Sequence, residues 1–480
     1  MANERVLRST DIPRSGELIS DRLIIEGGRP LEGKVRLQGA KNLALQAITC
    51  AILLTDGKLI LENVPRIADV ENTLAILRKL GANIEWQDQN VLSCDCSSLK
   101  PREIDPEESL KTTGSRYFIP VLARRYGLVV TGPSGGDRLG NGDRDDFSEE
   151  TLDSYAQMGL GHSDYKGRDG IKRHAFLSSP NLPVGSIRQE ERYFSNTVQA
   201  LLFHANGIQG HEFIIRNPCI EPEIFETIRL LNSMGAAIYY EGQGSDQGED
   251  FIYITSMASL AGTRFRIMSD PNVLVSYAVM AMITDGHVVI ENIDYSSKVD
   301  AFLQILSGMN ADFCYNANQR SLELSPSMSR LKQVDLETNF WPAECHTDWQ
   351  QILTPLLAKL DGESYIDENV HPARFTTFAP LLKMGAKLEL KTEPNRLKRK
   401  SFKAERPAKP HTLKITGPCE FASYSTRGPA DIRGTIALLA AMLSSSGVSI
   451  LDGASQIQRG MEDVVSTYNH WVQMFLWDRS

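Results

Sequence analysis

The sequence contains no long apolar stretch. Among its 480 residues there is no run of 18 apolar residues, and the first segment, MANERVLRSTDIPRSGELISDR, is polar and of mixed charge. A membrane-spanning helix needs about 20 apolar residues, and a signal peptide needs an apolar central region. Neither is therefore predicted, and we expect a cytoplasmic protein with no membrane partner.

The cysteines are few and scattered along the chain. The seven cysteines include no CxxC pair, so neither a disulfide scaffold nor a zinc site is expected. An excess of positive charge is also absent, since 51 basic residues face 60 acidic ones and the formal net charge is -9. That balance argues against a nucleic-acid partner, but it leaves room for a small anion in a locally basic cleft.

What the sequence does contain is a repeat. A glycine turn followed by alternating apolar residues, often ending in Asn or Asp, occurs six times at intervals of roughly 70 to 85 residues. Alternation of this kind predicts a strand with one buried face. The copies are DGKLILEN at Gly57, YGLVVTGP at Gly127, NGIQGHEFIIRN at Gly207, DGHVVIEN at Gly286, DGESYIDEN at Gly362 and SGVSILDG at Gly447.

A second motif is an amphipathic helix that ends in Gly-Ala and runs into a strand. Its copies are AILRKLGANIEW, IRLLNSMGAAIYY, FLQILSGMNADFCY and APLLKMGAKLEL, and glycine suits the left-handed end of a helix. An apolar helix also precedes each glycine-led strand, as in SNTVQALLFHA and RGTIALLAAML. The alternative is that these glycine-led strands are common to α/β proteins in general and do not mark a repeat. Against this, the helix and strand parts recur together and in the same order. We therefore predict an α/β fold.

The repeats divide into two groups of three, with the boundary near RFRIMSDPNV, before Asp270. We predict a first domain over 41–268 and a second over 20–40 plus 269–470. An active site is expected in the cleft between them, because domain interfaces favour ligand binding. The length and the 41% hydrophobic content are sufficient for two such cores.

Several longer motifs follow one another along the chain: GAKN, PEIFETIRLLNSMGA, HTDWQQ, ARFTTFAPLLKMGA, ADIRGTIALLAAML and QRGMED. Together with the six repeats, they resemble the enolpyruvyl transferase family over about residues 20–470. The similarity is greater to the UDP-N-acetylglucosamine 1-carboxyvinyltransferases than to the shikimate-pathway members. It implies a two-domain inside-out α/β barrel of six repeats, three per domain, with the first strand of the chain in the second domain.

The resemblance implies transfer of the enolpyruvyl group of phosphoenolpyruvate to an acceptor hydroxyl, by addition followed by elimination of phosphate. Phosphoenolpyruvate is a highly charged anion at neutral pH, so a closed site needs several fixed cations, and Arg suits bidentate contact with phosphate and carboxylate. The proton transfers need positioned acid and base groups. No metal or organic cofactor is implied.

Five residues are assigned through matching motifs. Lys41 in GAKN matches the lysine that contacts phosphoenolpyruvate, and Asn42 matches its neighbour, which contacts the acceptor. Arg433 in ADIRG and Arg459 in QRGME match two arginines that hold phosphoenolpyruvate, with Asp431 two residues before the first. In the alternative, Lys41 is a solvated turn lysine and the arginines hold surface salt bridges worth about 0 to 1 kcal/mol.

Three further residues are assigned by the same comparison. Asp348 in HTDWQQ matches the aspartate beside the reacting hydroxyl, although a carboxylate before an apolar helix is also a common N-cap. Arg374 in PARF matches an arginine of the acceptor site. The third arginine for phosphoenolpyruvate is displaced by two positions, because K-x-x-R-A-S has become KTTGSRYF, and Arg116 is the candidate. The TGSR segment is similar to the GT-x-R turn of shikimate-type enzymes.

The loop GPSGGDRLGNGDRDDF departs from the amino-sugar enzymes, which usually have Cys after the paired glycines. Asp137 stands at that position. A carboxylic acid with a raised pKa can protonate the methylene carbon, and it lacks the thiolate that fosfomycin alkylates. We therefore predict that Asp137 is the proton donor and that the enzyme is resistant to fosfomycin, the alternative being a turn aspartate among glycines.

Two other departures concern the acceptor. Residues similar to RPVDLH, which hold the uridine and diphosphate, have become NGDRDDFSEE, and Arg144 is only a loose counterpart. The segment S-V-G-A-T has become EERYFSNTV, with Glu191, Arg192 and Tyr193 in place of small residues. These changes put bulk and charge into the acceptor pocket and so favour a smaller or differently shaped acceptor. One branch of the family uses the 3'-hydroxyl of UMP in nucleoside antibiotic biosynthesis of the nikkomycin and polyoxin type, and we predict UMP.

Other functions remain open. They are UDP-N-acetylglucosamine 1-carboxyvinyl transfer in peptidoglycan synthesis, the shikimate-pathway reaction, and a catalytically degenerate nucleotide-binding paralogue, which the joint presence of Lys41, Asp348, Arg433 and Arg459 opposes. The insertion over 391–414 carries nine basic and two acidic residues. It either gathers anionic substrates or forms a solvated loop. We expect a monomer or a small homo-oligomer.

Overall fold

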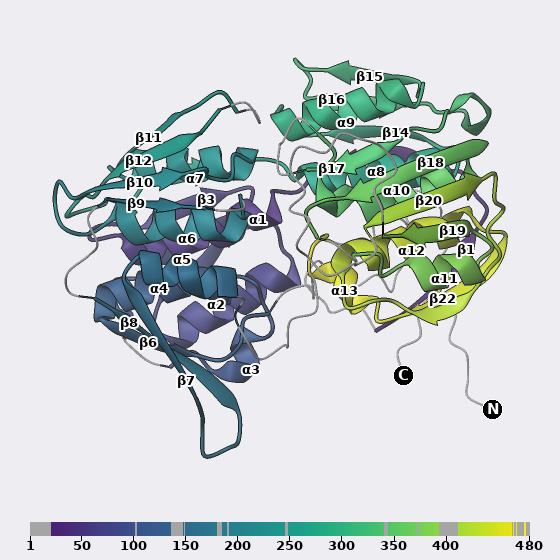
Figure 1. Cartoon of the computed structure of the whole chain (residues 1–480). Helices are drawn as coiled ribbons and strands as arrows, with labels where there is room; N and C mark the ends of the chain where they lie inside the picture. Colours follow the sequence, from purple (N-terminus) through teal and green to yellow (C-terminus); the bar gives the residue numbers. More distant parts are fainter. Residues whose placement is uncertain are drawn as a thin grey trace. The chain divides into compact units, whose positions relative to one another are not determined.

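The chain divides into two compact units, each with its own core (Figure 1). The first unit lies within residues 39–268, and the second joins residues 21–38 to those from 269 onward. The computed structural model describes residues 21–100, 103–135, 147, 149–179, 185–189, 192–244, 248–339, 344–371, 374–392, 411–462, 464, 467 and 475–476. No helix within these ranges is long and apolar enough to span a bilayer.

The described part of the first unit contains three small sheets, with strand orders β13-β3-β5-β4, β6-β8-β7 and β11-β12-β10-β9. The strands are β3 (Leu59–Glu62), β4 (Asn83–Asp88), β5 (Val91–Asp95), β6 (Leu128–Thr131), β7 (Leu160–Lys166), β8 (Lys172–Ser178), β9 (Gly185–Arg188), β10 (Glu212–Arg216), β11 (Ala237–Glu241), β12 (Phe251–Thr255) and β13 (Arg264–Arg266). The helices are α1 (Lys41–Cys50), η1 (Ala51–Leu53), α2 (Ala68–Lys79), α3 (Pro106–Ser109), α4 (Ser115–Tyr126), α5 (Glu149–Gln157), α6 (Phe194–Ala205) and α7 (Pro222–Ser233).

The described part of the second unit also contains three sheets, with orders β21-β22-β1-β23, β15-β16-β14-β2 and β17-β18-β20-β19. The strands are β1 (Arg22–Gly27), β2 (Glu32–Arg36), β14 (His287–Glu291), β15 (Phe313–Asn316), β16 (Ser321–Leu324), β17 (Leu336–Thr338), β18 (Gly362–Glu368), β19 (Lys387–Lys391), β20 (Thr412–Gly417), β21 (Ser425–Arg427), β22 (Gly447–Asp452) and β23 (Phe475–Leu476). The helices are α8 (Pro271–Ile283), α9 (Ser297–Gly308), η2 (Met328–Arg330), α10 (Thr347–Lys359), α11 (Phe378–Lys383), α12 (Ile432–Ser444) and α13 (Ser455–Gln458).

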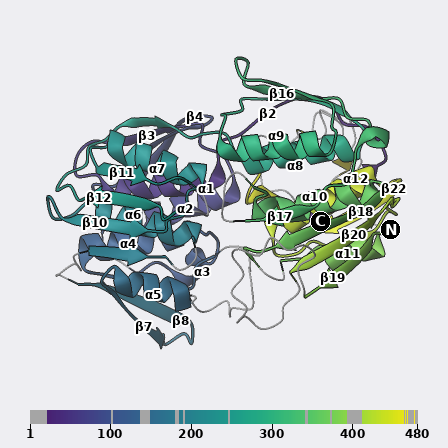
Figure 2. The same ribbon diagram turned by 45° about the horizontal axis from the view of Figure 1, so that its top comes forward.

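Five of these six sheets share one topology. A parallel pair at one edge is followed by two antiparallel pairs, as in β17, β18, β20 and β19, beside which α11 packs (Figure 2). The sheet β6-β8-β7 has only antiparallel pairs. At its edge, a single parallel bridge joins Thr131 of β6 to Ile104, which is where the other sheets have a parallel strand.

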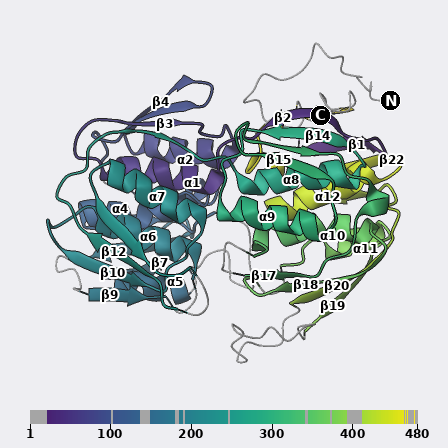
Figure 3. The ribbon, with the colours of Figure 1, turned by 90° about the horizontal axis from the view of Figure 1, so that it is seen from above.

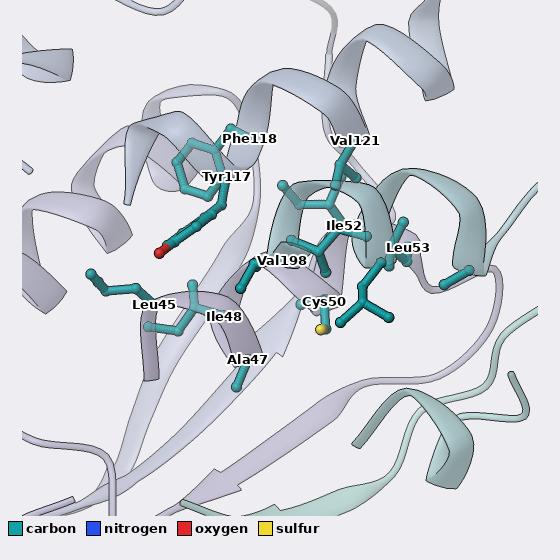
Figure 4. Packing of buried hydrophobic residues seen from close by; sticks show 14 of the residues in the cluster. Leu45, Ala47, Ile48, Cys50, Ile52, Leu53, Tyr117, Phe118, Val121 and Val198 are labelled. Carbon is teal, nitrogen blue, oxygen red and sulfur yellow. The ribbon is translucent and has the colours of Figure 1, made fainter. Parts of the chain in front are cut away.

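Buried helices form the interior of each unit. Every residue of α8 is buried, and its sequence PNVLVSYAVMAMI has no charged side chain, as expected for a helix surrounded on all sides. It packs against α10 and α12 (Figure 3). In the first unit, Leu45 and Ile48 of α1, Tyr117 of α4 and Val198 of α6 lie in one apolar cluster (Figure 4). The helix N-termini are consequently held in fixed positions within each unit.

The predicted glycine ends of the helices are confirmed at three of the four sites. Gly81, Gly235 and Gly385 follow α2, α7 and α11 with φ angles of 102°, 104° and 107°. In the fourth copy the prediction is wrong, because Gly308 is the last residue of α9 and Asn310 takes the left-handed position with φ 56°. Asn tolerates this conformation through its short polar side chain, so the backbone feature is kept with a different residue.

Candidate active site

Three buried helices of the second unit begin with a capped N-terminus. Asp270 caps α8 by accepting hydrogen bonds from two backbone amides, and Asp431 caps α12 in the same way. His346 caps α10 through its side chain, which accepts a hydrogen bond from the amide of Asp348 at 3.2 Å. Capping satisfies amides that would otherwise be unpaired at a buried helix end, and so it fixes the residues that follow.

The second residues of these helices meet at Asp348. Its Oδ2 accepts from Nδ2 of Asn272 on α8 at 3.3 Å and from Nε of Arg433 on α12 at 3.2 Å. Its Oδ1 accepts from Nη1 of Arg374 at 2.8 Å. Asp348 therefore lies at the centre of a network to which Arg374 and Arg433, two of the three predicted arginines of this unit, contribute.

Arg374 joins two carboxylates. Besides Asp348, its guanidinium contacts Oδ2 of Asp431 through Nε at 3.4 Å, and its side chain is only 2% exposed. Gln351 donates to the same oxygen of Asp431 at 2.5 Å, and Gln350 donates to the backbone carbonyl of Arg374. Asp431, predicted to be a supporting residue, thus caps α12 and anchors Arg374 at the same time.

The charges around Asp348 decide its protonation. Burial alone would raise its pKa, but the nearby charges of Arg433 and Arg374, with a contribution from His346, hold the pKa well below its usual range. The carboxylate is therefore ionised at neutral pH. Two cations and a neutral amide orient it, and this makes it a fixed acceptor for a proton or a hydroxyl group.

Arg433 retains donor capacity. Within the described ranges, its buried Nη1 has no hydrogen-bond partner, although Nε is engaged by Asp348. The residue is the second of α12, where the helix dipole also favours negative charge. A buried guanidinium with an unused N–H at a helix N-terminus can donate to a carboxylate or phosphate oxygen without first breaking its ion pair.

Glu368 is a buried carboxylate that sequence reasoning missed. It accepts from the hydroxyls of Thr338 and Thr347 at 2.9 and 3.0 Å and from two backbone amides. Burial raises its pKa against the opposing effects of those hydrogen bonds and of Arg374. Because Thr347 precedes Asp348 directly, Glu368 fixes the first turn of α10. The acidic pair in DGESYIDEN was the signal in the sequence.

The GAKN turn positions Lys41 in the first unit. A side chain at Gly39 would place Cβ 1.8 Å from the carbonyl oxygen of Asn63, so only glycine fits there. The amide of Ala40 donates to the carbonyl of Met268 at 2.7 Å. These contacts tie the start of α1 to the end of β3 and to the segment after β13, and Lys41 is the first residue of the helix.

Lys41 is paired with a carboxylate that the sequence did not reveal. Its Nζ lies 2.5 Å from Oδ2 of Asp69, and the two side chains are 10% and 0% exposed. Asp69 is the second residue of α2, and its backbone carbonyl accepts from Thr73 and Thr112. The lysine is therefore ion-paired in a nearly buried place, which excludes the solvated-turn alternative. Asn42, beside it, is half-buried.

Arg116 occupies the same helix position as Arg433. It is the second residue of α4, and its buried Nε has no partner in the described part of the chain. Gln199 of α6 approaches its backbone carbonyl at 3.5 Å. Two of the three arginines predicted to hold phosphoenolpyruvate thus share one structural setting, an unsatisfied guanidinium N–H at the start of a long helix.

Arg459 directly follows α13, and its Nη1 donates to Gln456 at 3.0 Å. The next residue, Gly460, lies beside α12, since a Cβ there would be 3.9 Å from Nη1 of Arg433. Gln38 donates to the carbonyl of Gly460 at 3.0 Å. The segment that carries Arg459 is therefore adjacent to Arg433.

The remaining predicted residues are either outside the described part of the chain or engaged elsewhere. Asp137, Arg144 and Glu191 lie outside the described residues. Arg192 is buried and pairs with Asp250 at 2.5 Å, so the interpretation that its charge enters the acceptor pocket is wrong. Among the described residues, no three His, Cys, Asp or Glu side chains are placed to hold a metal ion.

In the second unit, two buried arginines orient an ionised carboxylate at the N-termini of interior helices, an arrangement that suits an anionic ligand. The profile of the family "EPSP synthase (3-phosphoshikimate 1-carboxyvinyltransferase)" matches residues 25–467, so the chain belongs to this family of enolpyruvyl transferases. The predicted family and enzyme class are confirmed.

Individual relatives agree with this assignment. The chain is 29% identical over 444 residues to UDP-N-acetylglucosamine 1-carboxyvinyltransferase of Halothermothrix orenii, which covers 92% of this chain and 96% of the relative. It is 28% identical to UDP-N-acetylglucosamine 1-carboxyvinyltransferase 2 of Streptococcus mutans, with 93% and 97% covered.

Two solved structures share the fold. The enolpyruvyl transferase NikO from Streptomyces tendae aligns with a TM-score of 0.75 at 20% identity, over 94% of this chain and 97% of that one. EPSP synthase from Acinetobacter baumannii aligns with a TM-score of 0.66 at 17% identity, over the same shares.

Proposed function

We propose that the protein transfers the enolpyruvyl group of phosphoenolpyruvate to a hydroxyl of a uridine nucleotide, by addition and then elimination of phosphate. The observation that carries the proposal is the buried carboxylate of Asp348, held between Arg374 and Arg433 while Arg433 keeps an unused N–H. An oriented carboxylate beside an unsatisfied guanidinium suits a hydroxyl that must lose a proton next to a bound anion.

The cations have the role of binding phosphoenolpyruvate. We assign Lys41, Arg116, Arg433 and Arg459 to its phosphate and carboxylate groups. Lys41 is a nearly buried, ion-paired amine, and Arg116 and Arg433 each have a buried N–H without a partner in the described structure. Arg459 is included because it lies on the segment beside Arg433. Asp348 takes the proton of the acceptor hydroxyl or orients that hydroxyl. Its low pKa makes it a weak base while both arginines hold it, and an anion that draws on Arg433 strengthens it.

The second proton transfer, to the methylene carbon, is assigned to Asp137 from the sequence alone. The cysteine that amino-sugar enzymes have at this place also carries an acidic proton, so a carboxylic acid is a chemically equivalent donor. With Lys41 and Arg433 as electrostatic catalysts, these residues form the proposed catalytic set.

For the acceptor we propose UMP, at its 3'-hydroxyl, in nucleoside antibiotic biosynthesis. The support is the loss of both sugar-nucleotide motifs, with Asn42, Arg144, Asp348 and Arg374 assigned to the acceptor. Because Arg192 is paired with Asp250, its charge is no longer an argument for a smaller acceptor. Its size still is, since Arg192 stands where amino-sugar enzymes have small residues that contact the sugar nucleotide.

UDP-N-acetylglucosamine is the second candidate acceptor. It is favoured by relatives that are 27 to 29% identical over more than nine tenths of the chain. A catalytically degenerate, nucleotide-binding paralogue is the non-enzymatic alternative. Cytoplasmic location, oligomeric state, the domain limits and a substrate-gathering role for the basic insertion stay predictions.

We also infer that the units are inside-out α/β barrels made of six repeats in all, three in each. The shared topology of five sheets and the single bridge in the sixth support this.

The acceptor can be tested by incubating the purified protein with phosphoenolpyruvate and, separately, UMP, UDP-N-acetylglucosamine and shikimate 3-phosphate. Phosphate release and product mass are followed. An enolpyruvyl product from UMP alone supports the proposal, a product from the sugar nucleotide alone makes the second candidate correct, and no product with any acceptor favours the degenerate paralogue.

A further inference from the structure

Asn272 lies in the catalytic network, although no motif of the sequence pointed to it. It is the second residue of α8, the helix position that Asp348 and Arg433 occupy in α10 and α12, and it is 1% exposed. The side chain of Asp270 accepts from its amide at 2.8 Å, and Pro271 fills the first helical position. The backbone that carries the Asn272 side chain is therefore fixed.

Trp349 determines which way the amide of Asn272 points. Its indole Nε1 donates to Oδ1 of Asn272 at 2.8 Å. An indole N–H is a donor only, so it selects the oxygen of the amide and leaves the nitrogen on the other side. That nitrogen donates to Oδ2 of Asp348 at 3.3 Å. Trp349 is itself fully buried, with its ring edge-on to Phe302.

Asn272 differs in charge from the other side chains that donate to Asp348 in the described structure. Arg374 and Arg433 are cations, and an anionic substrate competes with Asp348 for them. A neutral amide is drawn much less strongly by a phosphate or carboxylate, and its own orientation depends on Trp349 and not on the arginines. It therefore keeps its hydrogen bond to Asp348 when the arginines turn to substrate.

We propose that Asn272, oriented by the indole of Trp349, is a positioning residue that holds the Asp348 carboxylate in place while phosphoenolpyruvate engages the arginines. This inference rests on the proposed function, because it requires Asp348 to act on the acceptor hydroxyl. It adds two positioning residues to the proposed mechanism, Trp349 acting on Asn272 and Asn272 on Asp348, and neither of them is proposed to touch substrate.

The test compares Asn272→Ala, Trp349→Phe and the double variant in steady-state assays of phosphate release. Asn272→Ala should lower kcat about 10-fold or more with KM for phosphoenolpyruvate changed less than about threefold. Trp349→Phe keeps an aromatic ring but removes the N–H, so it should lower kcat by a smaller factor. The double variant should be no slower than Asn272→Ala alone, because Trp349 acts through Asn272.

Two readouts separate positioning from packing. The acidic limb of the kcat profile should move to higher pH in Asn272→Ala, because the charged form of Asp348 loses a donor. Asn272→Asp keeps an oxygen for Trp349 and nearly the same volume but faces Asp348 with a like charge, so it should be slower than Asn272→Ala. Ser276→Ala is the matched control, since within the described residues its hydroxyl donates only to the backbone carbonyl of Asn272, at 2.8 Å, one turn along α8.

Unchanged kcat in Asn272→Ala overturns the inference, and so does a lowered melting temperature with an unmoved pH profile, or a double variant whose loss is the product of the two single losses. In each of these cases the wild type still releases phosphate, so the proposed function stands. Absence of phosphate release by the wild type with every acceptor overturns the proposed function and this inference together.

Discussion

At the scale of single residues, the proposed mechanism depends most on Asp348. It is ionised, buried among two arginines and an amide, and one residue away from a threonine that Glu368 holds. The network explains why a single carboxylate can both tune the arginines and serve the acceptor hydroxyl. Neutralising it tests that dual role directly.

Asp348→Asn should lower kcat about 10²- to 10⁴-fold, the range for loss of a positioned acid-base group. The rate of phosphate release at saturating substrate concentrations measures this change in kcat. Asp300→Asn is the matched control, because that carboxylate accepts a hydrogen bond from Tyr295 at the surface of the same unit. Activity of Asp348→Asn within about threefold of the wild type would assign the base role elsewhere.

Asp137 predicts the response to fosfomycin. The wild type should keep its activity after prolonged incubation, because a carboxylate lacks the nucleophilic thiolate that the inhibitor alkylates. Asp137→Cys should become sensitive in a time-dependent manner and acquire the corresponding mass. Time-dependent inactivation of the wild type would contradict the placement of Asp137 at the position of the family cysteine.

At the scale of elements, the end of α6 contains a buried imidazole without partners. In the described residues neither ring nitrogen of His204 has a hydrogen bond, and its ring stacks on Phe213. Burial, with smaller effects of His211 and Arg124, holds its pKa well below the usual range. The folded protein therefore keeps His204 neutral at pH values where the unfolded chain protonates it.

This difference makes the first unit sensitive to acid. Below about pH 6.5 the unfolded state binds one proton more than the folded state, so stability falls as pH falls, by about 1.4 kcal/mol per pH unit. His204→Leu should flatten the dependence of the free energy of unfolding between pH 7 and pH 5. His287→Leu, an exposed histidine paired with Glu323, should leave it unchanged. Equal slopes for His204→Leu and wild type would contradict the account.

The turn before α1 tests how local structure positions Lys41. Gly39→Ala forces the backbone at Asn63 to move, because Cβ would lie 1.8 Å from a carbonyl oxygen, and it should cost about 1 to 3 kcal/mol. Chemical denaturation measures the loss, and kcat should fall with it. Gly248→Ala, where no atom lies within 4 Å of the added Cβ, should be silent. A fully stable and active Gly39→Ala would show that the turn is adaptable.

Periodicity and glycine placement allowed the elements to be predicted, because both act within a few residues along the chain. Asn310 shows the limit of predicting helix ends from glycine. A residue with left-handed φ was required after α9, but asparagine adopts that conformation there in place of glycine. The partners of Asp69, Asn272 and Glu368 could not be predicted, because they lie 28, 76 and 21 residues away along the chain. Their partners are defined only when the repeats fold.

At the scale of the whole molecule, the order of motifs was sufficient to predict the family. The assignment of Arg116, which lies at the start of α4, stays a prediction. The interpretation of Arg192 was wrong because a buried ion pair leaves no trace in local sequence. The identity of the acceptor depends on a few side chains of its binding site, and similarity of fold does not determine it.

The central claim is that the carbon–oxygen bond of phosphoenolpyruvate breaks, and not the phosphorus–oxygen bond. Phosphoenolpyruvate labelled with ¹⁸O in its bridging oxygen, turned over with the accepted hydroxyl compound and analysed by mass spectrometry, decides between them. Addition and elimination predict that the label leaves with inorganic phosphate and that the acceptor gains an enolpyruvyl group. Label retained in pyruvate, with no change in the mass of the acceptor, would make the protein a phosphate-transferring or hydrolysing enzyme and contradict the account.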